Sequence, residues 1–171
     1  WNHGWEGETT DPEINAMRRR QVLNMMATQI LAVGTPMLTA GDEFGRTQKG
    51  NNNAYCQDSP ISWVNWDVDA EWREVQARVR DLIRIRQDHC AFRPTDYAYH
   101  NEIVNQHGEN LRRVDLTWMD GRFGEMGQDA WHDGGRRLLG MYVSNDHEGF
   151  LTWFNSAPDP QRIVLPAMPW G

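Results

Sequence analysis

The sequence has few of the residues that mark a cofactor site or a secreted protein. It contains only two cysteines, Cys56 and Cys90, so it has no disulfide framework and fits a reducing compartment or one incidental pair. The six histidines include no pair four residues apart, and there is no C-x-x-C motif, so we expect neither a metal site nor a cofactor. No apolar run approaches the roughly 20 residues of a membrane span, so we expect no membrane partner.

A surplus of positive charge is also missing. Lys and Arg number 17 against 24 Asp and Glu, which gives a net charge of -7 and a pI near 5.3. This balance argues against a nucleic-acid partner held through its phosphates, whereas a neutral ligand such as a sugar is compatible with it. Nine Trp, five Phe and four Tyr require a core, which excludes a disordered chain despite a mean hydropathy of -0.74.

The first residues lack both an initiating Met and the charged and apolar regions of a signal peptide. We therefore expect a piece of a longer, cytoplasmic protein. The sequence does not indicate an oligomeric state.

Two helices are predicted in the first half of the chain. Asp11 is a suitable N-cap, Pro12 suits the first helical position, and apolar residues then recur at helical spacing, which predicts a helix over 12–33 that Gly34 ends. A second helical apolar stripe predicts a helix over 70–89.

The segment between these helices contains a short apolar run and a long polar stretch. Residues 35–40 are apolar and flanked by turn signals, which is typical of a buried strand in a parallel sheet. The polar stretch from 44 to 67 is longer than an ordinary connection, and such loops are usually functional or disordered. Its aromatic residues argue against disorder.

Beyond about residue 92 the hydrophobic period changes to two. Alternating apolar residues predict short strands near 114–118, 139–143, 150–154 and 162–165, separated by turn-forming clusters of Gly, Asn and Asp. Such strands are typical of a β-sandwich or half-barrel. The change of period divides the chain into domains 1–91 and 92–171.

Two neighbouring acids follow the apolar run, at the end of a strand where α/β folds place their sites. Because neighbours on a strand point to opposite faces, at most one of Asp42 and Glu43 enters a cleft. The other is expected to cap a helix or to pair with Arg46. The same geometry argues against a retaining glycosidase pair, whose carboxylates face one bond at roughly 5 Å.

The polar stretch supplies further candidate ligand contacts. Asn51, Asn52 and Asn53 offer uncharged donors and acceptors that suit sugar hydroxyls. The rings of Tyr55, Trp63 and Trp66 suit the apolar face of a glucose unit. The alternative is an Asn-rich network of turns that bonds only to its own backbone.

Several motifs stand close together in this region. GDEFGRTQ at 41–48, GNNNAYCQD at 50–58 and ISW at 61–63, with WNHGWEG at 1–7, resemble the bacterial glycogen debranching enzymes of the isoamylase type, in the α-amylase superfamily. FLTWFN at 150–155 is more loosely similar to their C-terminal β-domain.

The resemblance implies a fold and an activity. The fold is α/β plus all-β: residues 1–91 would be the last part of a (β/α)8 barrel (helix 7, strand 8 and helix 8), and 92–171 a C-terminal antiparallel β-sandwich. The activity is retaining hydrolysis of α-1,6 branch linkages in glycogen or limit dextrin, with all catalytic carboxylates upstream of this chain. The partner would be a branched α-glucan, contacted by Asp42, Glu43, Arg46, Asn51, Asn52, Asn53 and Tyr55.

Two alternatives stay open at this point. The chain could be a non-catalytic glucan-binding or structural β-module, or part of a maltooligosyl-trehalose hydrolase. The loop with the Asn triplet is more similar to the debranching type.

Overall fold

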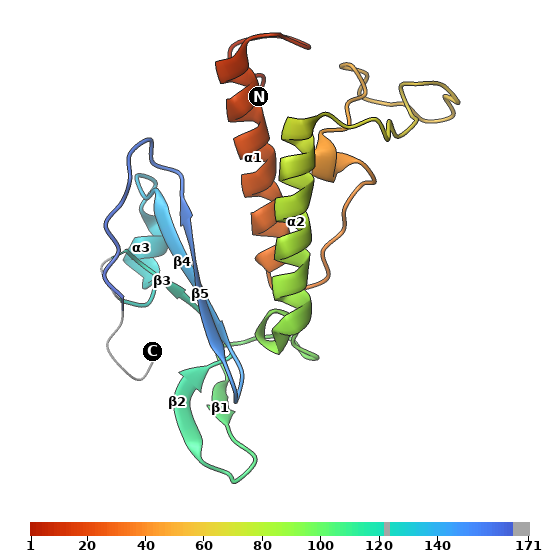
Figure 1. Ribbon diagram of the computed structural model, residues 1–171. Helices are drawn as coiled ribbons and strands as arrows, with labels where there is room; N and C mark the ends of the chain where they lie inside the picture. The colour runs from red at the N-terminus through yellow and green to blue at the C-terminus, as the bar shows by residue number, and fades with distance from the viewer. Residues whose placement is uncertain (122–123, 166–171) are drawn as a thin grey trace. The chain divides into compact units, whose positions relative to one another are not determined.

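The computed structural model describes residues 1–121 and 124–165 (Figure 1). The chain divides into two compact units. The first comprises Trp1–Ala32 and Pro36–Ile85, and the second comprises Val33–Thr35 and the chain from Arg86 onward.

Both predicted helices are confirmed. Helix α1 spans Pro12–Leu31, and the Asp11 carboxylate caps it by accepting hydrogen bonds from the backbone N–H groups of Glu13 and Ile14 at 2.9 and 3.1 Å. It ends slightly before the predicted limit, at Leu31. Helix α2 spans Ala70–Asp88. Neither helix is long and apolar enough to cross a membrane, and the same holds throughout the described residues.

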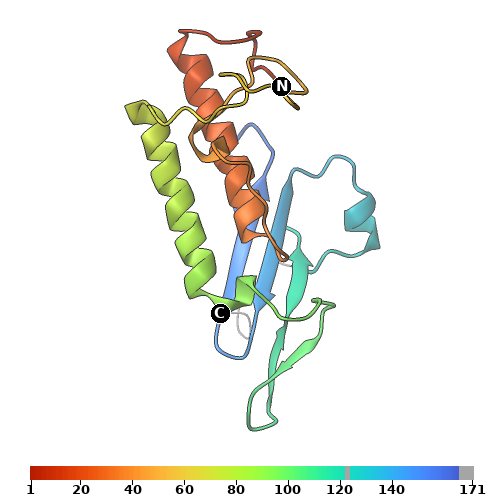
Figure 2. The ribbon, with the colours of Figure 1, turned by 90° about the vertical axis from the view of Figure 1, so that its right-hand side faces the viewer.

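In the first unit the two helices run side by side in the same direction (Figures 1 and 2). Met26 and Ile30 of α1 form a buried cluster with Val75 and Val79 of α2. The guanidinium of Arg19 in α1 forms an ion pair at 2.7 Å with the carboxylate of Glu71, in the first turn of α2. Because the helices are parallel, the segment between them must run from the end of α1 back to the start of α2, along the length of both helices.

That returning segment does not form the buried strand expected at residues 35–40. Residues 35–40 have no regular secondary structure, and the side chains of Met37 and Leu38 are 81% and 39% exposed. The expectation is wrong for this chain because a strand needs a hydrogen-bonded neighbour. Every strand among the described residues begins at Glu102 or later, in the second unit.

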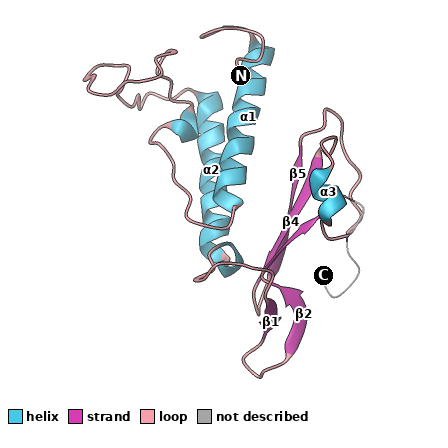
Figure 3. Ribbon diagram, turned by 180° about the vertical axis from the view of Figure 1, so that it is seen from behind, coloured by secondary structure: helices cyan, strands magenta, loops and turns pink. Residues whose placement is uncertain are grey.

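The second unit contains two antiparallel sheets (Figure 3). Strands β1 (Glu102–Val104) and β2 (Asn110–Val114) form one pair. Strands β3 (Leu116–Met119), β4 (Leu138–Ser144) and β5 (Gly149–Asn155) form the other sheet, in that order. The strands expected near 139–143 and 150–154 are confirmed, and a short helix, α3 (Gln128–His132), was not predicted. The packing of two sheets into a sandwich stays a prediction.

Of the other two strand predictions in this unit, one is confirmed in part and one is wrong. The expected strand at 114–118 is split at Asp115, whose carboxylate accepts hydrogen bonds from the Asn101 and Leu116 backbone N–H groups at 2.8 and 2.7 Å. The chain therefore leaves one sheet there and enters the other. Residues 162–165 form no strand, because no described strand pairs with them, and Val164 is 53% exposed.

Candidate functional site

The acids predicted as site residues lie in a tight turn. Gly41, with φ +98°, is the N-cap of a single 3-10 turn, η1 (Asp42–Phe44), and Gly45 follows with φ +77°. Both values lie in the left-handed region that favours glycine. A side chain at Gly45 would also meet the Trp72 ring of α2 at 2.4 Å. This close approach fixes the turn against the start of α2.

The two acids have different surroundings, as expected of neighbours. The Glu43 carboxylate accepts a hydrogen bond from the Gly41 N–H at 2.9 Å and so caps the turn. The expected alternative, an ion pair with Arg46, does not form, because the Arg46 guanidinium donates instead to the Ser62 carbonyl at 2.8 Å. The Asp42 carboxylate is half-buried and makes no hydrogen bond among the described residues. Asp42 is therefore the acid that remains available to a ligand.

The three asparagines at 51–53 also differ from one another in their contacts. The Asn51 side-chain oxygen accepts from the Asn53 N–H at 2.9 Å, and the Asn53 oxygen accepts from the Tyr55 N–H at 3.2 Å. These two side chains stabilise turns, which was the alternative to ligand contact. Asn52 is exposed and its amide makes no hydrogen bond among the described residues, and Tyr55 is 82% exposed. A role in ligand contact for this loop thus depends mainly on Asn52 and Tyr55.

Two further aromatic rings are exposed in the same loop. Trp63 is 57% and Trp66 is 75% exposed. The Trp63 indole N–H donates to the Asp58 carboxylate at 2.7 Å, and the Trp66 ring lies 5.9 Å from buried Phe44. The loop therefore presents ring faces that are fixed by the protein, together with uncharged amide groups. This arrangement suits stacking against a sugar ring and does not by itself supply acid–base chemistry.

Arg18 of α1 holds the N-terminal loop. The charged run Arg18, Arg19 and Arg20 predicts a solvated helix face, and this prediction is wrong for Arg18. Arg18 of α1 instead donates hydrogen bonds to the backbone carbonyls of Asn2, Trp5 and Gly7. No spacing rule signals this role, because the partners are backbone atoms distant in sequence. Arg18 thereby positions the WNHGWEG motif.

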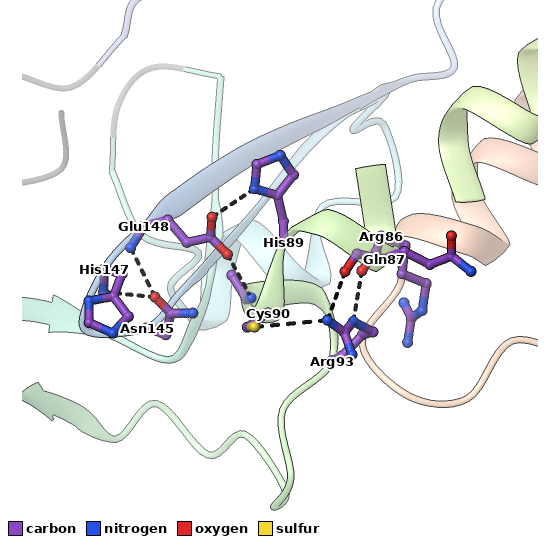
Figure 4. A network of polar contacts seen from close by, with 9 residues as sticks. Arg86, Gln87, His89, Cys90, Arg93, Asn145, His147 and Glu148 are labelled. Atoms are coloured by element: carbon purple, nitrogen blue, oxygen red, sulfur yellow. Dashed lines mark hydrogen bonds and ion pairs between the residues drawn. The ribbon is translucent and has the colours of Figure 1, made fainter. Parts of the chain in front are cut away.

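The second unit contains its own polar cluster (Figure 4). The Glu148 carboxylate, in the turn between β4 and β5, lies 2.7 Å from His89 Nδ1 and accepts a hydrogen bond from the Ala91 N–H at 3.2 Å. Arg93 donates to the carbonyls of Arg86 and Gln87 at the end of α2, both at 2.8 Å. These bonds hold the 3-10 turn η2 (Cys90–Phe92) against the β4–β5 turn.

The surroundings of Glu148 lower its pKa. Partial burial acts in the opposite direction, but the hydrogen bonds from His89 and Ala91 and the charge of His89 outweigh it. The pKa therefore lies below its ordinary value of 4.5. A carboxyl whose pKa is lowered in the folded state stabilises the fold above its unfolded pKa, and this contribution is lost as the pH falls through the folded value.

We expect Glu148→Gln to lower the free energy of unfolding by about 1–2 kcal/mol near neutral pH, because one charged acceptor serves two donors. The difference from wild type should vanish when the pH falls below the folded pKa of Glu148. Urea unfolding of both proteins at neutral and acidic pH measures this. Asp146→Asn in the same turn is the control and should have little effect, since Asp146 forms an ion pair with the exposed His147 and such surface pairs contribute little. A Glu148→Gln deficit that persists in acid would contradict the account.

The described residues contain no group of three or more His, Cys, Asp or Glu side chains arranged to hold a metal ion. Both cysteines are free and exposed.

By its fold, the chain combines a helical unit with an antiparallel β unit. No family model matches the sequence. It is 35% identical over 179 residues to a glycogen operon protein GlgX homolog of Mycobacterium tuberculosis (strain ATCC 25618 / H37Rv), covering 97% of this chain and 24% of the relative. Glycogen debranching enzymes of Pectobacterium atrosepticum (36% over 170 residues) and Cronobacter sakazakii (33% over 169 residues) each match 99% of this chain and 23% of their own length.

These matches confirm the resemblance carried by the motifs: over nearly all of its length the chain is a relative of bacterial glycogen debranching enzymes. The chain spans about a quarter of the length of these relatives, 24% or 23%.

Proposed function

We propose that the chain is the C-terminal part of a cytoplasmic glycogen debranching enzyme, which hydrolyses α-1,6 branch linkages in glycogen or limit dextrin with retention. The observation that carries the proposal is the exposed loop with Asn52 and Tyr55, within a chain that matches debranching enzymes along 99% of its length. The catalytic carboxylates would lie upstream of this chain. Two free cysteines fit a reducing compartment.

The parallel helices support a barrel origin for residues 1–91. In a (β/α)8 barrel, successive helices are parallel and the strand between them runs in the opposite direction. Helices α1 and α2 are parallel, and residues 35–40 would be the strand between them in the longer protein. One of the exposed side chains Met37 and Leu38 would then pack in the barrel interior and the other against the surrounding helices. Residues 92–171 would form the C-terminal β-sandwich.

In this proposal residues 41–58 lie at the end of the barrel strand, on the face where barrel enzymes bind substrate. Asn52 and Asp42 would hydrogen-bond glucose hydroxyls, and Tyr55 would stack on a glucose ring. Glu43, Arg46, Asn51 and Asn53 would shape the loop and contact the glucan through the positions that their internal bonds leave open.

We expect Asn52→Ala and Tyr55→Ala in the longer protein to lower kcat/KM on branched glucan. The loss of transition-state stabilisation should be about 1–3 kcal/mol each, as for a lost polar or stacking contact. Reducing-end assays on limit dextrin measure the loss. Lys49→Ala, an exposed change in the same loop, is the control and should keep kcat/KM. Wild-type kinetics for both Asn52→Ala and Tyr55→Ala would refute the placement of this loop in the cleft.

A further inference from the structure

The second unit contains a pocket that the proposed function does not use. Its volume is about 310 Å³, at the lower end of the range typical of small-molecule sites. Three chain segments line it: residues 98–100, strand β3, and the stretch from Glu125 to α3. The side chains that matter below are Tyr99, His100, Thr117, Trp118, Glu125 and Trp131.

Aromatic rings form much of the wall. Trp131 of α3 is 52% exposed and meets the half-buried Trp118 of β3 edge-on, with ring centroids 6.0 Å apart. Tyr99 is 74% exposed, and its ring lies 6.0 Å from that of Tyr97, which is itself 82% exposed. Exposed rings at a pocket are energetically costly in water and offer flat apolar faces to a ligand.

The polar part of the wall is small. The Glu125 carboxylate lies 3.9 Å from His100 Nε2, and both side chains are about half exposed. Thr117 of β3 borders the same space but is 5% exposed. A lining with several flat rings, one imidazole and one carboxylate offers stacking faces and hydrogen-bond partners to a ring that carries hydroxyls.

The pocket is held by the fold. The Met126 N–H donates to the Trp118 carbonyl at 2.8 Å, and Glu125 pairs with Met119 in an isolated β-bridge. On the opposite side, the Asp115 carboxylate accepts from the N–H groups of Tyr99 and Asn101 at 3.3 and 2.8 Å, on either side of His100. The rings therefore need little ordering when a ligand binds, which favours affinity.

We propose that this pocket binds a glucose residue of an α-glucan chain, at a site in the second unit separate from the 41–58 loop. The choice of an α-glucan as ligand rests on the proposed function, whereas the pocket itself does not. Tyr99 and Trp131 present the stacking faces, and His100 and Glu125 supply donors and acceptors for hydroxyls. The site would tether the β unit to its polymeric substrate.

The test is a titration of the ¹⁵N-labelled 171-residue chain with maltoheptaose, followed by two-dimensional NMR. We expect saturable shifts at the backbone of residues 98–100 and 116–118 and at the Trp131 indole. Trp131→Ala and Tyr99→Ala should each raise Kd about tenfold, as expected for the loss of one ring face. Tyr55→Ala should leave these shifts unchanged. Amide chemical shifts of β5 that match those of the wild-type chain show that each variant is folded.

Absence of saturable shifts at the pocket, or an unchanged Kd in both folded pocket variants, would overturn the inference. The proposed function is tested separately, by the kinetics of Asn52→Ala and Tyr55→Ala in the longer protein. Failure of one proposal is therefore distinguishable from failure of the other.

Discussion

The purified 171-residue chain is expected to release no reducing sugar from a branched glucan above a heat-treated control. Glycoside hydrolysis needs two carboxyl groups that flank one bond, about 5–5.5 Å apart in retaining enzymes. In the 41–66 loop, Asp42 and Glu43 are sequence neighbours, and Glu43 already caps the Gly41 N–H. Without the acid and the nucleophile, the loss of rate relative to an intact enzyme should exceed about a millionfold.

The assay uses limit dextrin, with the longer protein at equal concentration as the positive control. Release of reducing sugar by the chain alone above the heat-treated control would contradict the assignment of catalysis to residues upstream.

The second large effect concerns backbone protection in the isolated chain. We expect amides of residues 35–40 to exchange with solvent rapidly and those of β4 and β5 slowly, with rates at least about a thousandfold apart. Residues 35–40 have no strand partner, and Met37 is 81% exposed. Strands β4 and β5 are paired along their whole length, from Leu138–Asn155 to Ser144–Gly149.

Hydrogen exchange followed by mass spectrometry or NMR measures this difference. In the longer protein, residues 35–40 should become protected, because the barrel would supply neighbouring strands on both sides. Slow exchange throughout Thr35 to Ala40 in the monomeric chain would show that this segment does not depend on a missing barrel.

Local signals in the sequence were sufficient to predict both long helices and two of the strands. Asp11 and Pro12 mark the start of α1 because an N-cap acts within one turn. Strands β4 and β5 follow from a period of two in their apolar residues. The burial itself does not alternate, because β4 is buried continuously from Gly140 to Ser144 and the interior of β5 is half-buried throughout. Residues 35–40 have an equally apolar pattern, but a strand depends on a partner, and the pattern does not show whether a partner is present.

The candidate site was located by motifs, but the roles within it depend on three-dimensional contacts. The sequence could not show that Glu43 caps a turn, that Arg46 reaches Ser62, or that Asn51 and Asn53 bond to their own loop. The pocket around Trp131 was missed for a related reason: its walls come from three separate segments that no short motif joins.

The central claim is that this chain belongs to an enzyme that cleaves α-1,6 branch points, and analysis of the reaction products tests it most directly. Limit dextrin is incubated with the longer protein, and the anomeric proton signals of α-1,6 and α-1,4 linkages are followed by NMR. We predict that the α-1,6 signal disappears, the α-1,4 signal persists, and new reducing ends appear first as the α-anomer, as retention requires. An unchanged α-1,6 signal, or the release of trehalose from a maltooligosyl-trehalose substrate, would contradict the account.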